Sequence, residues 1–247
     1  MYNMENITFI SVFDYGSREL GLNHLQSLKH SGIENYTAYV TDKRTFDYIR
    51  SCGDFVVTLH PELSSVPENR KDFGTPDFNR FSYNRYKIVN DLLKQKKAVW
   101  YMDVDTVVTP EIRNVYNKYV GKDVFFQNDC HMMCTGCVLY YPTASSINFT
   151  EYVWDNASSE KNDQNFIFDL YNSTRLVGLD FGIFDFSEFP NGLLFFDMDI
   201  QVPPQIMEIK RAYKSNTNKR VAFIHANWMI GVDAKKEALI RGGVWYS

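Results

Sequence analysis

Residues 97–110 read Lys-Ala-Val-Trp-Tyr-Met-Asp-Val-Asp-Thr-Val-Val-Thr-Pro. The segment 98–102 is apolar, contains β-branched and aromatic residues, and is followed by two acidic residues, Asp103 and Asp105. This pattern predicts a short buried strand in the centre of a parallel sheet. If the chain stays extended past the strand end, residues two apart point to the same side, and both carboxylates then converge at the carboxyl end of that strand.

Two converging carboxylates repel each other unless a cation lies between them. Ligands that are all oxygen suit Mg²⁺ or Mn²⁺ better than Zn²⁺, and such ions commonly bind phosphate oxygens as well. The segment therefore predicts a site for a divalent ion and a diphosphate.

Length and composition describe an ordinary soluble globular protein. The chain has 247 residues, of which 45% are hydrophobic and 23% charged, enough for one large α/β domain or two small ones. A net charge of −4 argues against nucleic acid or an anionic membrane as a partner. Aromatic residues make up 16% of the chain, which favours core packing and permits sugar stacking. No apolar run approaches the ~20 residues of a membrane span, and residues 1–6 are unlike a signal peptide, so we expect a cytoplasmic location.

Three cysteines, Cys130, Cys134 and Cys137, have the C-x3-C-x2-C spacing of radical-SAM iron–sulfur sites, and His131 adds a possible zinc ligand. The motif lies in mid-chain, however, and residues 138–141 continue as a predicted strand. We therefore expect the cysteines to be buried packing residues, with a metal cluster as the alternative.

Strands and helices alternate along the chain, which predicts a Rossmann-like, mostly parallel sheet. Residues 61–79 break the alternation with prolines and glycine, typical of a surface loop or a loop that meets a substrate. Residues 177–219 show no usable period before a late strand. No domain boundary is evident. The predicted strands cover 6–13, 36–40, 55–59, 98–102, 124–127, 135–141 and 220–224; the predicted helices cover 17–30, 81–93, 143–154, 162–170 and 233–241, with a further helix after Thr41-Asp42.

The order of several short motifs resembles the glycogenin-like retaining GT-A glycosyltransferases, over roughly residues 7–245. These motifs are Asp103-Val-Asp105, Thr135-Gly136, Asp163-Gln164, and His225 followed by Gly231 and Lys235. The His-x-Asn-Trp segment at 225–228 also resembles the neighbouring nucleotide-diphospho-sugar transferase family. The resemblance implies a single GT-A domain over 1–247, with a mostly parallel central sheet flanked by helices. Residues from about 1 to 107 would form the nucleotide-binding half and those from about 108 to 247 the acceptor and catalytic half, and a smaller acceptor-side region would lie beside the sheet.

The resemblance also implies roles for individual residues. The ligands of Mn²⁺ or Mg²⁺ would be Asp103, Asp105 and His225. The donor, a nucleotide sugar and in particular a UDP-sugar, would meet Tyr15 stacked on uracil, Lys87, the backbone of Val104, and Gly231 and Lys235 at the diphosphate. The catalytic residues facing the sugar would be Asp163 and Gln164. The substrate-binding residues would be Asp129, Thr135, Gly136 and Asn227.

Chemistry supports these assignments independently of the resemblance. A departing nucleoside diphosphate needs positive charge, which a divalent ion and Lys235 would supply. The Asp163 carboxylate or the Gln164 amide oxygen could stabilise an oxocarbenium-like centre. Transfer to a glycan or glycoprotein hydroxyl with retention then follows from front-side attack or from double displacement, and the sequence leaves both open.

Other interpretations of the same residues stay open at this point. His225 could be structural, Asp163 a helix N-cap, Lys87 a solvated helix residue and Tyr15 a core residue. A second acidic pair, Asp197-Met-Asp199, follows an apolar run and is predicted to be a strand end or turn. Two rival functions fit the leading motif: a haloacid-dehalogenase-type phosphatase with Asp103 as nucleophile, and a non-enzymatic, metal-dependent carbohydrate-binding module.

Overall fold

The computed structural model describes residues 4–60, 74–173 and 178–247. In this part of the chain a seven-stranded sheet has the order β3-β2-β1-β4-β7-β6-β8, and β7 runs opposite to the other six strands. The predicted α/β class with a mostly parallel sheet is therefore confirmed. The strands are β1 (Ile7–Phe13), β2 (Tyr36–Val40), β3 (Val57–Leu59), β4 (Ala98–Met102), β6 (Val124–Asn128), β7 (Met133–Tyr140) and β8 (Phe181–Ile183).

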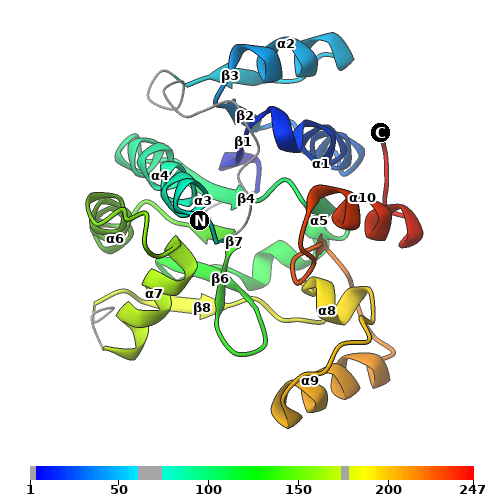
Figure 1. Ribbon diagram of the computed structural model, residues 1–247. Coiled ribbons are helices and arrows are strands. Elements are labelled where there is room, and N and C mark those ends of the chain that lie inside the picture. The colour runs from blue at the N-terminus through cyan, green and yellow to red at the C-terminus, as the bar shows by residue number, and fades with distance from the viewer. Residues whose placement is uncertain (1–3, 61–73, 174–177) are drawn as a thin grey trace.

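Helices cover both faces of the sheet (Figure 1). They are α1 (Arg18–His30), α2 (Lys43–Cys52), α3 (Pro76–Ser82), α4 (Asn84–Lys94), α5 (Ile112–Val115), α6 (Ala144–Asp155), α7 (Asp163–Asn172), α8 (Gly192–Phe195), α9 (Pro204–Ser215) and α10 (Val232–Arg241). Short 3₁₀ turns lie at Met4–Asn6, Tyr15–Ser17 and Tyr116–Lys118. Helices α4, α6 and α7 pack on one face, whereas α1, α5 and α10 pack on the other.

Strand β4 is the central strand that the sequence predicts, and all five of its residues are buried. Its side chains alternate between two cores: Val99 and Tyr101 join the α4 face, and Trp100 joins the α1 face, where it stacks on Phe9 with ring centroids 5.4 Å apart. The strand pairs parallel to β1 but antiparallel to β7, so its surroundings are parallel on one side only.

A separate two-stranded ribbon lies beside the main sheet. Strand β5 (Thr106–Val108) follows the acidic pair and pairs antiparallel with β9 (Phe223–His225), with Thr106 opposite His225. The late strand predicted at 220–224 is thus shifted toward the C-terminus, and it joins this ribbon instead of the main sheet. The ribbon brings the end of β9 next to the end of β4.

Local predictions were confirmed in part and wrong in part. The apolar run before Asp197 forms the short helix α8 (Gly192–Phe195), and Asp197 lies in the turn that follows it, so the turn is the correct one of the two predicted alternatives. Asp197 has a φ of 49° and forms ion pairs with Lys210 and Lys214. Helix α9 and strand β8 fall in the region where no period was found. Ser17 precedes α1 but makes no capping hydrogen bond; Asp14 caps the preceding 3₁₀ turn instead. Helix α8 and strand β8 are only four and three residues long, so tertiary packing outweighs their local signals.

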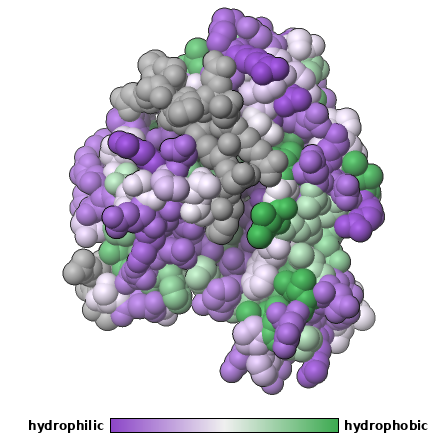
Figure 2. Space-filling model, viewed as in Figure 1, coloured by the Kyte–Doolittle hydropathy of each residue, from purple (hydrophilic) through white to green (hydrophobic). Residues whose placement is uncertain are grey.

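The loop predicted at 61–79 lies mostly outside the described residues, and its end forms helix α3. No helix among the described residues is long and apolar enough to cross a membrane. The face shown in Figure 2 is largely hydrophilic, and its hydrophobic residues gather mainly in the right half, over the C-terminal elements α8 to α10.

Candidate functional site

The two predicted acidic ligands and the predicted histidine ligand lie together at the carboxyl end of β4. His225 Nε2 is 3.3 Å from Asp105 Oδ1 and 4.0 Å from Asp103 Oδ2. One ligand atom from each residue lies within 4.8 Å of the others, the spacing that a single ion requires. Asp105 and His225 are buried, whereas Asp103 is half-buried and open to a ligand. The two carboxylates suit Mn²⁺ or Mg²⁺, and the imidazole offers a nitrogen ligand beside them, so the residues present fit a divalent ion.

Lys235 completes this acidic cluster from helix α10. Its Nζ atom lies 2.6 Å from Asp105 Oδ2. Burial alone would raise the pKa of the Asp105 carboxyl, but the Lys235 ammonium outweighs burial and holds that pKa well below its usual range. Burial would lower the pKa of the Lys235 ammonium, and Asp105 raises it instead. Asp105 is therefore a carboxylate and Lys235 a cation over the physiological pH range.

Gly136 lies directly behind the acidic cluster. A Cβ atom built on it would lie 2.5 Å from Asp103 Oδ2 and 2.5 Å from His225 Cε1. Its carbonyl oxygen accepts a 2.7 Å hydrogen bond from the backbone N–H of Asp103. The absence of a side chain at this position lets β7 pass close to the predicted ligands, and the predicted contact of Gly136 with substrate stays a prediction.

Arg85 connects the acidic cluster to the predicted catalytic aspartate, and sequence analysis missed it. Its Nη1 donates to Asp103 Oδ1 at 3.0 Å, and its Nη2 donates to Thr135 Oγ1 at 2.7 Å and to Asp163 Oδ2. Burial alone would lower the pKa of Arg85, but Asp163 and the surrounding oxygens raise it well above its usual value. Lys87, the residue predicted instead, is on the same helix and pairs with Asp91 at 2.8 Å. A buried arginine without a sequence motif gives no signal before the fold is known.

Asp163 and Gln164 begin helix α7. Asn162 caps this helix by accepting the N–H of Asn165 at 2.9 Å, which leaves the Asp163 carboxylate for Arg85 and for the hydroxyl of Tyr86 at 2.8 Å. The interpretation of Asp163 as the N-cap is therefore wrong. Gln164 accepts the N–H of Thr135 at 3.3 Å through Oε1 and places Nε2 3.4 Å from Asp129 Oδ2.

Asp129 is the centre of a buried polar network in the loop between β6 and β7. Its Oδ1 accepts hydrogen bonds from three side chains: Trp228 Nε1 at 2.6 Å, Asn227 Nδ2 at 3.1 Å and Asn191 Nδ2 at 3.2 Å. Trp228 has a backbone in the left-handed region, with a φ of 66°. Three of the predicted substrate-binding residues are thus joined by hydrogen bonds: Asp129 and Thr135 each contact Gln164, and Asn227 contacts Asp129. Asn191 was not predicted.

The remaining predicted donor-binding residues lie around the same end of the sheet. Tyr15 is half-buried between two guanidiniums, with Arg18 and Arg44 at 4.1 and 3.6 Å from its ring centroid. The side chain of Val104 packs into the core beside the acidic pair. Gly231, with a φ of 99°, precedes helix α10 and positions Lys235 one turn later.

The three cysteines do not converge with other potential metal ligands in the described part of the chain. Cys134 and Cys137 are buried and Cys130 is half-buried, and all are free thiols. The cluster of Asp103, Asp105 and His225 is the one group of three or more potential ligands that converges among the described residues. Cys137 is a packing residue on β7, as predicted.

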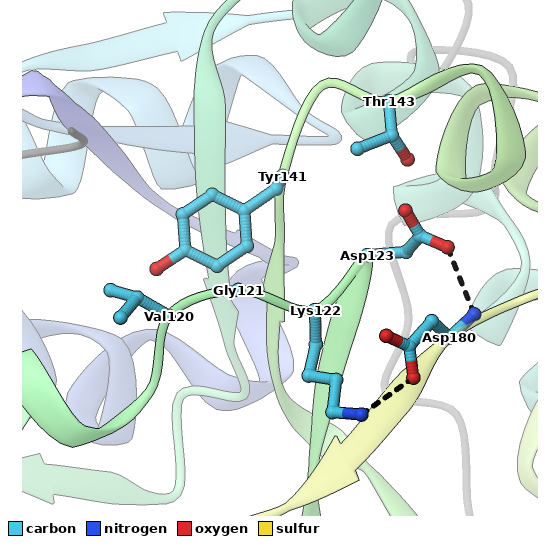
Figure 3. Close-up of a pocket in the computed structure, with 7 residues that line it drawn as sticks. All are labelled: Val120, Gly121, Lys122, Asp123, Tyr141, Thr143 and Asp180. Atoms are coloured by element: carbon cyan, nitrogen blue, oxygen red, sulfur yellow. Dashed lines mark hydrogen bonds and ion pairs between the residues drawn. The ribbon is translucent and has the colours of Figure 1, made fainter.

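A hollow of 270 Å³ lies at the opposite edge of the sheet (Figure 3). The segment before β6, the end of β7 and Asp180 line it. Lys122 forms an ion pair with Asp180 at 2.7 Å, and Asp123 accepts the N–H of Asp180 at 2.9 Å. The charged side chains around the hollow are therefore paired with neighbouring groups of the same chain. None of the predicted site residues lines this hollow.

Comparison with known proteins identifies the family. The family model for nucleotide-diphospho-sugar transferases matches residues 31–239. The chain belongs to the nucleotide-diphospho-sugar transferase family. This membership favours the transferase over the phosphatase and the carbohydrate-binding module that the sequence left open.

One curated relative in this comparison is a UDP-galactose:fucoside alpha-3-galactosyltransferase of Dictyostelium discoideum. It is 22% identical over 298 residues, and the match covers 99% of this chain but only 44% of that protein. The chain thus spans less than half the length of its curated relative.

Solved structures of glycosyltransferases share the fold. The apo-form glycosyltransferase GlyE of Streptococcus pneumoniae TIGR4 matches with a TM-score of 0.58 and 12% identity, over 97% of this chain and 64% of that chain. The galactosyltransferase LgtC, solved with donor and acceptor sugar analogs, matches with a TM-score of 0.56 and 11% identity, over 97% of this chain and 96% of that chain. The predicted GT-A fold is therefore confirmed.

Proposed function

We propose that this member of the family transfers a sugar from a UDP-sugar to a hydroxyl of a glycan or glycoprotein, with retention of configuration. The observation that carries the proposal is the convergence of Asp103, Asp105 and His225 at the end of β4, joined through Arg85 to Asp163. The names of the Dictyostelium relative and of LgtC make UDP-galactose the first donor to test.

A Mn²⁺ or Mg²⁺ ion held by Asp103, Asp105 and His225 would supply positive charge to the departing diphosphate. Lys235 lies beside the ion site and adds a second positive charge there. Arg85 holds Asp103 in place from the other side. These groups stabilise the negative charge that develops as the glycosidic bond breaks.

Asp163 supports the reaction electrostatically in this proposal. Its carboxylate is buried and bonded to Arg85 and to the hydroxyl of Tyr86, and both bonds reduce its nucleophilicity. The side-chain amide of Gln164 is fixed by hydrogen bonds to the backbone N–H of Thr135 and to the Asp129 carboxylate. This arrangement favours front-side attack by the acceptor hydroxyl, with the Gln164 amide oxygen at the developing oxocarbenium face.

A donor-hydrolysis screen tests the proposal. UDP release from a panel of nucleotide sugars is measured with and without Mn²⁺, and the product anomer is read by NMR. We expect Mn²⁺-dependent UDP release from a UDP-sugar with retained configuration. Phosphatase activity without any nucleotide-sugar dependence would contradict it.

A further inference from the structure

Gln127 is a fully buried residue of β6 beside His225, and the proposed reaction assigns it no role. The pairing of β6 with β7 shifts between Phe126 and Gln127: Phe126 lies opposite Val138, whereas Gln127 lies opposite Cys134. The intervening residues of β7, which include Gly136, form a bulge beside the acidic cluster. Bulges of this kind redirect side chains next to active sites, and here Gln127 reaches the imidazole.

The hydrogen bonds of Gln127 fix the orientation of its amide. Its Nε2 donates to the carbonyl oxygens of Phe189 at 3.2 Å and Pro190 at 3.1 Å. A carbonyl oxygen can only accept, so the NH₂ group must face these two atoms and Oε1 must face the other way. Oε1 lies 2.7 Å from His225 Nδ1.

This orientation determines the protonation of the imidazole. Because Oε1 can only accept, Nδ1 must carry a proton to make the 2.7 Å hydrogen bond. In the neutral ring the proton is then absent from Nε2, whose lone pair faces Asp105 Oδ1 at 3.3 Å. The opposite tautomer would place an N–H between the two carboxylates and leave no lone pair for a metal ion.

We propose that Gln127 is a positioning residue that selects the Nδ1-protonated tautomer of His225 and so presents Nε2 as a metal ligand. The inference rests on the metal site of the proposed function. A partner on the far nitrogen of a ligating histidine fixes both its tautomer and its ring orientation.

A matched control is available in the same fold. Asn90 on α4 is also a buried amide, and its Nδ2 donates to the carbonyl of Ile147 at 2.8 Å and to Thr150 Oγ1 at 2.9 Å. Both of these partners belong to α6, away from the acidic cluster. Asn90→Leu therefore removes a buried, hydrogen-bonded amide without touching His225.

The experiment combines two measurements on the intact chain. First, ¹⁵N NMR of the metal-free protein, at a pH where the imidazole is neutral, reads which nitrogen of His225 is protonated, with the signal assigned by its loss in His225→Ala. We expect Nδ1 to be protonated in the unmodified protein and Nε2 to gain protonation in Gln127→Leu. Second, EPR of free Mn²⁺ gives the dissociation constant. We expect Gln127→Leu to raise it about 10–100-fold, and Asn90→Leu to change it less than about twofold.

Each outcome decides between the alternatives. An Nε2-protonated tautomer in the unmodified protein overturns the inference, even if no Gln127 variant folds. So does a Mn²⁺ dissociation constant that changes no more in Gln127→Leu than in Asn90→Leu. Gln127→Met, which preserves side-chain length, serves where Gln127→Leu is unstable. Failure of the unmodified protein to bind Mn²⁺ overturns the metal site of the proposed function as well, which distinguishes the two failures.

Discussion

Two groups of charged side chains lie at opposite edges of the same sheet, and each contains two aspartates and a lysine. At the carboxyl end of β4, Asp103 and Asp105 converge on His225, and Lys235 is 2.6 Å from Asp105. At the other edge, Lys122 pairs with Asp180 at 2.7 Å beside Asp123 (Figure 3).

The two groups differ in how far their charged side chains are buried. The Asp105 side chain is 8% exposed, whereas those of Lys122 and Asp180 are 42% and 59% exposed. A buried carboxylate is costly without a cation, whereas an exposed carboxylate is solvated and pairs weakly. The same residue types thus form a candidate metal site at one edge and an ordinary surface ion pair at the other.

The largest expected effect comes from removing one buried carboxylate. Asp105→Ala is expected to lower Mn²⁺-dependent UDP release at least about 1000-fold, because it removes both a metal ligand and the partner of Lys235. Asp123→Ala at the opposite edge is the control and should change the rate less than about twofold. Equal losses in the two variants, measured by steady-state kinetics, would remove the distinction between the two edges.

Acid is expected to destabilise the folded protein through His24, which contacts the ribbon that carries His225. His24 on α1 is buried with its Nδ1 3.0 Å from Thr106 Oγ1, and burial lowers its pKa to about 4. Between about pH 6.5 and 4 the unfolded chain binds a proton that the folded protein does not, so stability falls as pH falls. The contribution is about 3 kcal/mol. Urea unfolding at a series of pH values should show the free energy of unfolding fall as the pH falls. This pH dependence should be weaker in His24→Leu. An equal pH dependence in the variant would show that other titratable groups cause it.

Substitutions at two glycines distinguish a change in metal affinity from a change in backbone stability. Gly136→Ala places a methyl group against Asp103 and His225 and is expected to weaken Mn²⁺ binding about 10–100-fold. Gly121, which lines the hollow of Figure 3, has a φ of 84°, and no atom lies within 4 Å of the position that a Cβ would take there. Gly121→Ala should cost about 1–2 kcal/mol of stability and leave Mn²⁺ affinity unchanged. Titration calorimetry and thermal melts of both variants check this, and unchanged affinity in Gly136→Ala would contradict it.

The smallest expected effect is at the exposed ion pair. Lys122→Ala should change the free energy of unfolding by less than about 1 kcal/mol, because both side chains are largely solvated. UDP release should also stay at the rate of the unmodified protein. A loss of several kcal/mol in denaturant unfolding would show that this exposed ion pair stabilises the fold as strongly as a buried one, which would contradict the comparison.

Part of the fold was predictable because its signals are local. The buried run that became β4, the alternation of β1, α1 and β2, and the caps of α2, α6 and α7 depend on neighbouring residues. The bulge in β7 and the short helix α8 were not predictable in this way, since each depends on partners elsewhere in the chain.

The residues of the candidate site also fall into those that local sequence predicts and those that only the fold reveals. Asp103 and Asp105 directly follow a predicted strand and lie two residues apart, which was enough to predict that their carboxylates lie together. The extended chain assumed for that prediction is not observed, because β4 ends at Met102 and Val104 and Asp105 form a turn. Arg85 and Gln127 have no motif of their own, and only the packing of α4 and β6 around the cluster shows what they touch.

By itself, the sequence determined the strand, the acidic pair at its end and the order of the motifs that follow. Only the tertiary structure decided that β9 pairs with β5, that Lys235 meets Asp105 across 130 positions, and that Gln127 meets His225 across 98. The physical reason is that backbone periodicity acts over a few residues, whereas a buried polar group takes whichever partner the folded chain brings within hydrogen-bonding distance.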